Sequence, residues 1–437
     1  MSDARSTALK LLIKSQENKT YSNIALDEAL KRSQLSAQDK KLTAALFYGV
    51  TERIITLDRI IAKYSKRPCD KLSSGIRGVL WLGLYQLKFM DGIPDNAAVD
   101  ESVKLAKKDK NPAAAGFVNA VLRSFIRDEK ALPEGKNELE NLSIEYSCPI
   151  WLIEKWLREY SKEQTMSLLQ SSVGQPPTTI RVNTTKITPD ELVKRLSDEG
   201  IKAKKVSLLE NCLSISNVAS IEATDAFKQG LFHVQDIASQ ICCEALDAKN
   251  ASLLLDVCSA PGGKAFTAAQ IMKNGSVMAF DLHENRVRLI KGGAERLGLS
   301  NVTASVNNAK VYSDDMPKAD RILCDVVCSG LGVIRRKPEI KYKSPEEMER
   351  LPEIQYDILS TSSRYLKKDG ILIYSTCTVS RAENENVVQK FLKNNPDFEA
   401  VNVFDDKGGL FKTPFLTLTP KDLNSDGFFI AKLKRVK

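Results

Sequence analysis

Two cysteines stand where a thiol can do chemistry. Cys328 lies in "CDVVCSG" and Cys377 in "IYSTCTVS", and each follows an apolar stretch that is typical of a buried strand. Because the carboxyl ends of parallel strands meet at one edge of a sheet, we expect both thiols and Asp325 to face one crevice. A modest fall in pKa turns a thiol into a nucleophilic thiolate. The pair therefore indicates covalent catalysis, whereas either cysteine alone would more simply be a small buried side chain.

A second group of residues predicts a site for a nucleoside-containing cofactor. The segment "LLLDVCSAPGGKAF" has the order strand, turn, helix, and Gly262 and Gly263 let a ligand approach the backbone where the helix begins. Asp281 ends the next predicted strand, "SVMAFD", where a carboxylate can accept hydrogen bonds from both ribose hydroxyls. The turn matches neither the Gly-x-Gly-x-x-Gly pattern of NAD enzymes nor the phosphate loop of nucleotide triphosphatases.

The composition excludes several other classes of protein. The chain has only two histidines, His233 and His283, and no Cys-x-x-Cys pair, so we expect neither a zinc site nor a serine triad. Its nine cysteines are an odd number without the dense spacing of a disulfide scaffold, which favours reduced thiols. No run of eighteen apolar residues and no apolar leader is present. We therefore expect a cytoplasmic protein with no metal and no membrane association.

The charge of the chain is basic and uneven. Residues 1–140 contain 24 Lys and Arg against 18 Asp and Glu, so they carry +6 of the net charge of +9. Nucleic acid is the commonest partner of a basic soluble protein, although a solvated helical surface would give the same count. The first third of the chain is therefore the candidate for contact with nucleic acid.

The periodicity of apolar residues predicts three domains. Residues 1–140 show helical spacing almost throughout, as in "LTAALFYGVTERIITLDRIIAKY", and predict an all-α domain. Residues 141–236 begin with a helical connector and continue in the order βαββαβ, which predicts a small ferredoxin-like module. Residues 237–437 alternate apolar strands with helices, which predicts a parallel, doubly wound sheet.

Three motifs occur in an order that resembles a known family. "DVCSAPGGK", "DVVCSGLGVIRRKPEIK" and "STCTVSRAENE" resemble the cofactor and catalytic motifs of the RNA cytosine-5 methyltransferases that use S-adenosylmethionine. The helical front, with "FVNAVLR", resembles the NusB-like domain of the bacterial Sun/Fmu type, which methylates a cytosine of small-subunit (16S) ribosomal RNA. The resemblance covers essentially the whole chain. It implies a NusB-like RNA-binding domain, a ferredoxin-like RNA-binding module, a Rossmann-like methyltransferase domain, small-subunit ribosomal RNA as the partner, and a monomer.

The resemblance also implies a role for each site residue. Cys377 would attack C6 of cytosine, Asp325 would bond to the N3 edge of the base, and Cys328 would assist loss of the C5 proton or release of product. The products would be 5-methylcytosine and S-adenosylhomocysteine. The residues implied in cofactor binding are Cys258, Ser259, Ala260, Pro261, Gly262, Gly263, Lys264, Asp281, Asn308 and Asp325.

The sequence departs from the family pattern at two places. Asn308 lies where the family commonly has an aspartate that contacts the adenosine moiety, and an amide retains the ability to form a neutral hydrogen bond. Val326 and Val327 replace Ala-Pro before the motif cysteine, so the loop loses a fixed φ angle and gains an N–H donor. The nearby basic run Arg335, Arg336 and Lys341 either favours a thiolate or is a solvated loop.

Two alternatives remain open at the level of sequence. The chain could be an RNA-binding assembly factor whose methyltransferase fold has lost turnover through the valine and asparagine changes, although a purely binding protein has no use for both Cys328 and Cys377. It could also be a methyltransferase for DNA or transfer RNA, although a NusB-like front is not expected on those enzymes.

Overall fold

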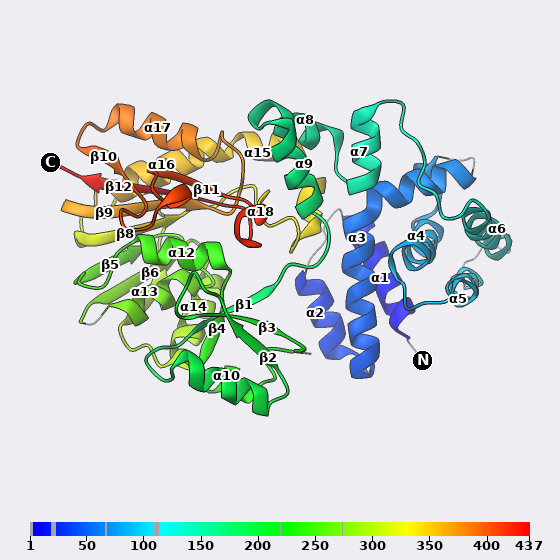
Figure 1. Ribbon diagram of the computed structural model, residues 1–437, viewed down its shortest axis with the longest axis horizontal. Helices are drawn as coiled ribbons and strands as arrows, with labels where there is room; N and C mark the ends of the chain where they lie inside the picture. Colours follow the sequence, from blue (N-terminus) through cyan, green and yellow to red (C-terminus); the bar gives the residue numbers. More distant parts are fainter. Residues whose placement is uncertain (1–2, 19–22, 66–67, 109–112, 219, 273) are drawn as a thin grey trace. The chain divides into compact units, whose positions relative to one another are not determined.

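The computed structural model describes residues 3–18, 23–65, 68–108, 113–218, 220–272 and 274–437 (Figure 1). The chain divides into two compact units. The first comprises Met1–Val173 together with Lys337–Lys343, and the second comprises Gly174–Arg336 with Ser344–Lys437.

The first unit is helical, as the apolar spacing predicts. Its elements are α1 Ala4–Asn18, α2 Asn23–Arg32, α3 Ala37–Ser65, η1 Cys69–Lys71, α4 Ser74–Phe89, α5 Asp95–Ala106, α6 Ala114–Arg127, α7 Glu138–Tyr146, α8 Ile150–Glu159, α9 Lys162–Ser171 and η2 Pro338–Tyr342. Across the described part of both units, no helix has both the length and the apolar content that a membrane crossing requires.

The core of the helical unit forms around α3 and α4. α3 buries residues at helical spacing, among them Leu46, Val50 and Leu57, so one stripe of the helix faces the core. α4 is buried on most of its surface because it is apolar nearly throughout, and it begins where the Ser73 side chain accepts a hydrogen bond from an orphan N–H. Fully buried side chains of α3 and α4 thus give this unit its own core.

The second unit contains a small antiparallel sheet with the predicted βαββαβ order. Its elements are β1 Thr178–Val182, α10 Pro189–Asp198, β2 Lys202–Lys205, β3 Cys212–Ser216, α11 Asp225–Lys228 and β4 Phe232–Val234. The strand order is β2-β3-β1-β4, which is the ferredoxin-like arrangement. α10 begins in a capping box, where Thr188 and Glu191 each bond to the other's backbone N–H.

The same unit contains an eight-stranded sheet in the order β10-β12-β9-β8-β5-β6-β7, with β11 paired to β12. The strands are β5 Leu253–Asp256, β6 Ser276–Asp281, β7 Val302–Val306, β8 Ala319–Asp325, β9 Leu366–Thr376, β10 Phe398–Val401, β11 Phe415–Leu418 and β12 Phe428–Arg435. β5 to β9 pair in parallel, as predicted. The C-terminal edge differs, because β12 runs antiparallel to β9, β10 and β11 and makes the sheet mixed.

Helices cover both faces of this sheet, as a doubly wound fold requires (Figure 1). α12 Ile237–Ala245, α13 Gly263–Ile271 and α14 Glu284–Leu297 pack on one face, and α16 Leu351–Ser363 and α17 Glu385–Asn394 pack on the other. The remaining short helices are α15 Pro345–Glu349, η3 Gly409–Phe411 and α18 Pro420–Leu423. The chain enters the sheet at β5, runs outward to β7 and returns at β8, so the strand order reverses between β5 and β8. Ligands of open α/β sheets bind at such a point.

Polar contacts fasten the small sheet to the end of α14. The Asn183 amide donates to the carbonyls of Gly230 and Leu297, at 2.8 and 2.9 Å. The Arg296 guanidinium donates to the carbonyls of Phe227 and Phe232. A Cβ on Gly230 would lie 2.0 Å from the Arg296 carbonyl oxygen, so only glycine fits at this close approach.

Candidate active site

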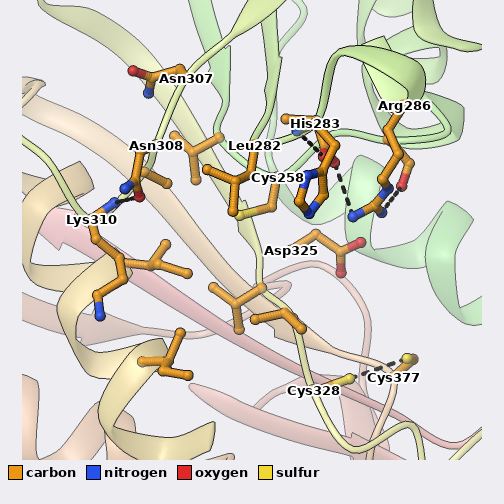
Figure 2. A pocket seen from close by; sticks show the side chains of 18 residues that line it. Cys258, Leu282, His283, Arg286, Asn307, Asn308, Lys310, Asp325, Cys328 and Cys377 are labelled. Carbon is orange, nitrogen blue, oxygen red and sulfur yellow. Dashed lines mark hydrogen bonds and ion pairs between the residues drawn. The ribbon is translucent and has the colours of Figure 1, made fainter. Parts of the chain in front are cut away.

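A cavity of about 360 Å³ opens at the carboxyl ends of the parallel strands (Figure 2). Its walls come from the segments that follow β5, β6, β7, β8 and β9 and from α16. The residues that line it are Val257, Cys258, Ala260, Asp281, Leu282, His283, Arg286, Asn307, Asn308, Ala309, Lys310, Asp325, Val326, Val327, Cys328, Ile354, Ile358 and Cys377. Its volume is within the range of small-molecule sites.

The predicted glycine turn forms one wall. Ser259 N–H donates to the Phe280 carbonyl and Gly262 N–H to the Ser259 carbonyl, both at 2.7 Å, so the turn is tied to β6 and to itself. Gly262 has a φ of +109°, and a Cβ there would lie 2.3 Å from the Phe266 ring. Glycine is therefore required at this position for both conformation and space. Cys258 and Ala260 line the cavity, whereas the lining does not include Ser259, Pro261, Gly262 and Gly263.

Asp281 lies at the end of β6, buried but facing the cavity. One carboxylate oxygen accepts from the His283 N–H at 3.2 Å, and the other lies 3.3 Å from Arg286 Nη1. Arg286 Nη2 also donates to the Ala260 carbonyl at 3.1 Å, so this side chain links the glycine turn to Asp281. Sequence reasoning missed Arg286, although its place in the first turn of the helix after the strand was a usable signal.

Asn308 lies on the opposite side of the cavity from the thiols (Figure 2). Its side-chain oxygen accepts from the Lys310 N–H at 3.1 Å, which folds the loop after β7 around the amide. Leu282 lies near Asn308 (Figure 2), and Ile358 adds apolar surface to the cavity lining. A polar amide beside apolar side chains is a surface on which a flat aromatic ring can bind.

The two thiols meet, as the strand-end argument predicts. Cys328 Sγ and Cys377 Sγ are 3.2 Å apart, and both residues line the cavity. The pKa of Cys328 is raised well above its usual range, first by the hydrogen bond with Cys377, then by burial and by the negative charges of Cys377, Glu383 and Asp325. Two such close thiols share one proton, because a second ionisation would place two negative charges in contact. The contact with Cys377 and burial thus oppose ionisation of the Cys328 thiol.

Asp325 stands beside the thiols in a fixed orientation. One carboxylate oxygen accepts from Ser375 Oγ at 2.8 Å, and the other accepts from Lys264 Nζ at 2.6 Å. Burial alone would lower the pKa of Lys264, but the Asp325 carboxylate more than reverses this and raises it, so the ammonium stays charged. Lys264 does not line the cavity but holds Asp325 from behind, a role that the sequence did not indicate.

Asp256, at the end of β5, is a further carboxylate that the sequence did not single out. Asp256 is 1% exposed, and hydrogen bonds from the Ser259 side chain and the Cys258 backbone only partly offset the effect of this burial on its pKa. Burial and the nearby Asp325 charge raise its pKa from 3.8 to about 7. The folded chain thus binds this proton more tightly than the unfolded chain does.

Replacing Asp256 with asparagine should therefore remove a pH-dependent loss of stability. A carboxyl whose pKa is raised on folding contributes stability at low pH that is lost as the pH rises through its folded pKa. Between pH 5 and pH 8, the advantage of Asp256→Asn over the wild type in free energy of unfolding should grow by about 3 kcal/mol. Urea unfolding of both proteins at the two pH values, followed by circular dichroism, measures this growth.

Asp320→Asn is the matched control for that experiment. Burial tends to raise the pKa of Asp320, but Lys367 and two backbone N–H groups lower it overall, so the carboxylate is ionised in both states above pH 5. Its difference from the wild type should stay constant between pH 5 and pH 8. A constant difference for Asp256→Asn as well would show that Asp256 does not carry a raised pKa.

The basic run after Cys328 does not line the cavity. Arg335 donates to Asn424 and Ser425, and Arg336 makes ion pairs with Asp236 and Asp426 at 3.0 and 2.7 Å. Lys341 belongs to the helical unit, where its ammonium donates to the Glu52 carbonyl and burial lowers its pKa to about 8. These cations brace loops and do not contact the thiols, and the hypothesis that they favour a thiolate has no support in their contacts.

Comparison with known proteins gives the chain a family. Residues 2–127 match the NusB family, residues 148–222 the ferredoxin-like domain of RsmF/B-like methyltransferases, and residues 243–434 the 16S rRNA methyltransferase RsmB/F. The "Probable ribosomal RNA small subunit methyltransferase B" of Bacillus subtilis is 37% identical over 441 residues, which cover 99% of this chain and 98% of that protein. The chain belongs to the RsmB/F family.

A second relative agrees with this assignment, and a solved structure shows the same fold. The "Ribosomal RNA small subunit methyltransferase B" of Escherichia fergusonii is 31% identical over 405 residues, which cover 92% of each chain. The crystal structure of PH0851 has the same fold, with a TM-score of 0.82 at 24% identity over 98% of each chain. The helical NusB domain, the ferredoxin-like module and the methyltransferase domain predicted from the sequence are thereby confirmed as fold classes.

The cavity of this RsmB/F chain lies within the stretch matched by the methyltransferase model. Of the predicted site residues, Cys258, Ala260, Asp281, Asn308, Asp325, Cys328 and Cys377 line it. Sequence reasoning missed its apolar wall, which includes Leu282, Ile354 and Ile358. No motif marks these residues, because α16 reaches the cavity only through its packing on the sheet.

Proposed function

We propose that this chain transfers the methyl group of S-adenosylmethionine to C5 of a cytosine in 16S ribosomal RNA. The observation that carries the proposal is the pair of thiols, which lie 3.2 Å apart beside Asp325. They line a cavity whose other lining residues, Asp281 and Asn308, suit a nucleoside. Membership in the RsmB/F family supports the transfer of methyl groups and ribosomal RNA as the substrate. The choice of C5 and of a covalent route rests on the thiols.

The residues present fit the cofactor. The Asp281 carboxylate faces the cavity and retains free lone pairs for ribose hydroxyls, while Asn308 and its apolar neighbours suit an adenine ring. The turn after β5 brings Cys258 and Ala260 to the cavity wall just before α13 begins, where backbone can approach the ligand. When bound, S-adenosylmethionine supplies an electrophilic methyl group on a sulfonium.

The two thiols act in different steps of the proposed reaction. Cys377 as thiolate adds to C6 of the base, which forms a C6–S bond and makes C5 nucleophilic toward the methyl group. Asp325, held by Lys264 and Ser375, bonds to the N3 edge of the base. Once C5 is methylated, Cys328 takes the C5 proton, the electron pair restores the C5–C6 double bond, and the C6–S bond breaks.

The contact between the two thiols explains why Cys328 takes the C5 proton only after Cys377 has attacked C6. Before attack, the hydrogen bond to Cys377 and its charge keep Cys328 protonated. Attack converts the Cys377 sulfur to a neutral thioether, which removes both of these causes. The pKa of Cys328 then falls, so it becomes a base only after the covalent bond has formed.

The NusB-like front and the ferredoxin-like module supply RNA contacts in this proposal. We assign residues 1–140 and 141–236 to RNA binding and residues 237–437 to catalysis. The net charge of +6 on residues 1–140 supports contact with phosphates, which position an RNA without specifying the base.

Labelled methyl transfer tests the proposed function. The full chain is incubated with S-adenosylmethionine labelled in the methyl group and with unmodified 16S ribosomal RNA, and the RNA is then digested to nucleosides. Label in 5-methylcytidine is the expected result. Label in another nucleoside would overturn the C5 assignment, and no label despite RNA and cofactor binding would favour an assembly factor without turnover. Transfer RNA and DNA serve as comparison substrates.

A further inference from the structure

The geometry points to Glu383 as a positioning residue: we propose that its buried carboxylate ties the Cys328 loop to the Cys377 loop and holds the two thiols in reach of each other. For its effect on turnover this inference rests on the proposed function. The geometric part concerns the two sulfur atoms alone and is measured without RNA.

Sheet pairing does not itself bring the thiols together. The register between β8 and β9 ends at the pair Asp325 and Ser375, and only the Val326 N–H continues it by donating to the Ser375 carbonyl. Cys328 and Cys377 lie three and two residues beyond that last pair, in loops. Other contacts must therefore fix the loops relative to each other.

The Glu383 side chain provides these contacts. It is 2% exposed, and one oxygen accepts from Ser329 N–H at 2.8 Å and from Gln355 Nε2 at 3.0 Å. The other oxygen accepts from Ser329 Oγ at 2.6 Å. Gln355 Nε2 also donates to the Val327 carbonyl at 2.9 Å. The backbone on both sides of Cys328 is thus held by one carboxylate and its amide partner.

Glu383 is in turn fixed to the Cys377 loop. It lies six residues after Cys377 in the segment between β9 and α17, its N–H donates to the Ser380 carbonyl, and its own carbonyl accepts from the buried Tyr374 hydroxyl. Ser329 Oγ completes the link with a 2.8 Å contact to Thr378 Oγ1, next to Cys377. A backbone bond from Gly332 N–H to the Cys377 carbonyl is a further tie between the loops.

The carboxylate also acts through its charge. The donors that it accepts from are neutral groups, and its negative charge is one of the causes that raise the pKa of Cys328. Glu383 therefore favours the protonated form of Cys328. Different substitutions of Glu383 can separate the effect of its hydrogen bonds from the effect of its charge.

Three variants of the full chain make this separation. Glu383→Ala removes the whole bridge. Glu383→Gln keeps it without the charge, because the amide oxygen can accept both N–H donors while the amide NH₂ donates to Ser329 Oγ, which turns its hydrogen to Thr378. Glu385→Ala is the matched control, since Glu385 bonds to Thr417 on β11 and not to the Cys328 loop.

The first readout is the rate at which diamide oxidises Cys328 and Cys377 to a disulfide. Each thiol gives up a proton and an electron, the S–S bond forms, and diamide is reduced to the hydrazine. A disulfide demands close approach of the two Sγ atoms, so Glu383→Ala should form it about tenfold more slowly than the wild type. Glu383→Gln and Glu385→Ala should stay near the wild-type rate. Peptide mass spectrometry identifies the linked pair.

The second readout is turnover. Glu383→Ala should lower kcat for RNA methylation about 100-fold, as expected for a misplaced catalytic group, with KM for S-adenosylmethionine nearly unchanged. It should also accumulate a covalent RNA adduct, because release fails while attack continues. A merely destabilised protein would lose adduct and product together. Glu383→Gln should restore most of kcat and show a shifted pH profile.

The outcomes separate the two proposals. If Glu383→Ala does not fold, Ser329→Ala, which removes the hydroxyl link to Glu383 and Thr378, is measured in the same way and should slow disulfide formation. Disulfide formation at the wild-type rate in the variant tested would overturn the role of Glu383. A wild type that forms the disulfide rapidly but yields no labelled 5-methylcytidine would count against the proposed function alone.

Discussion

Cys377→Ala is expected to abolish methyl transfer while RNA binding remains. Without the sulfur no C6–S bond forms, and C5 of cytosine stays too weak a nucleophile to take the methyl group. We expect the rate to fall by about 10⁴-fold or more, as for loss of a covalent nucleophile in other enzymes. The rate is measured from labelled S-adenosylmethionine at saturating RNA, and binding is measured by gel shift.

Cys148→Ala is the matched control for that measurement. Cys148 is a fully buried free cysteine. Its substitution also removes one thiol, but a thiol that contributes only to packing. It should leave the rate near that of the wild type. Full activity of Cys377→Ala would overturn the assignment of Cys377 as nucleophile and would direct attention to Cys328, the other thiol of the pair.

Cys328→Ala is expected to trap the enzyme on its substrate. Cys377 can still attack C6 and C5 can still take the methyl group, but no base removes the C5 proton, so the C6–S bond does not break. Most of the enzyme should then migrate with RNA on a denaturing gel, and steady turnover should stop after one cycle. The wild type should show little adduct, because release follows methylation.

The double variant Cys328→Ala/Cys377→Ala controls for other crosslinks. It should give no adduct, because the attacking sulfur is absent. If Cys328→Ala turns over normally and forms no adduct, then another group removes the proton. The raised pKa of Cys328 would in that case reflect only its contact with Cys377 and its burial.

Particular residues show why the site was only partly predictable. Cys328, Cys377, Asp325 and Asp281 follow apolar strands, and the rule that parallel strands end at one edge is enough to bring them to one cavity. Lys264 is expected among the cofactor residues, and the structure shows its ammonium bonded to Asp325 without lining the cavity. A spacing rule gives the place of a backbone and not the direction of a flexible side chain.

The strands at the C-terminal edge of the large sheet could not be predicted from the apolar pattern of the sequence either. β10 and β11 have four residues each and lack the continuous apolar run of the central strands. Their strand conformation depends on pairing with β12, which lies far along the chain. Short strands of this kind are decided by the partner that they meet, so the sequence pattern predicted neither β10 nor β11.

The sequence by itself determined the order of the domains, the family and the strand-end residues, because periodicity and short motifs are local properties of the chain. Only the tertiary structure decided how the thiols are held and which groups surround them. Glu383 reaches Ser329 across 54 residues, Lys264 reaches Asp325 across 61, and burial raises the pKa of Asp256. Contacts between such distant residues depend on how the elements pack and on where water is excluded. Neither property can be predicted from a local stretch of sequence.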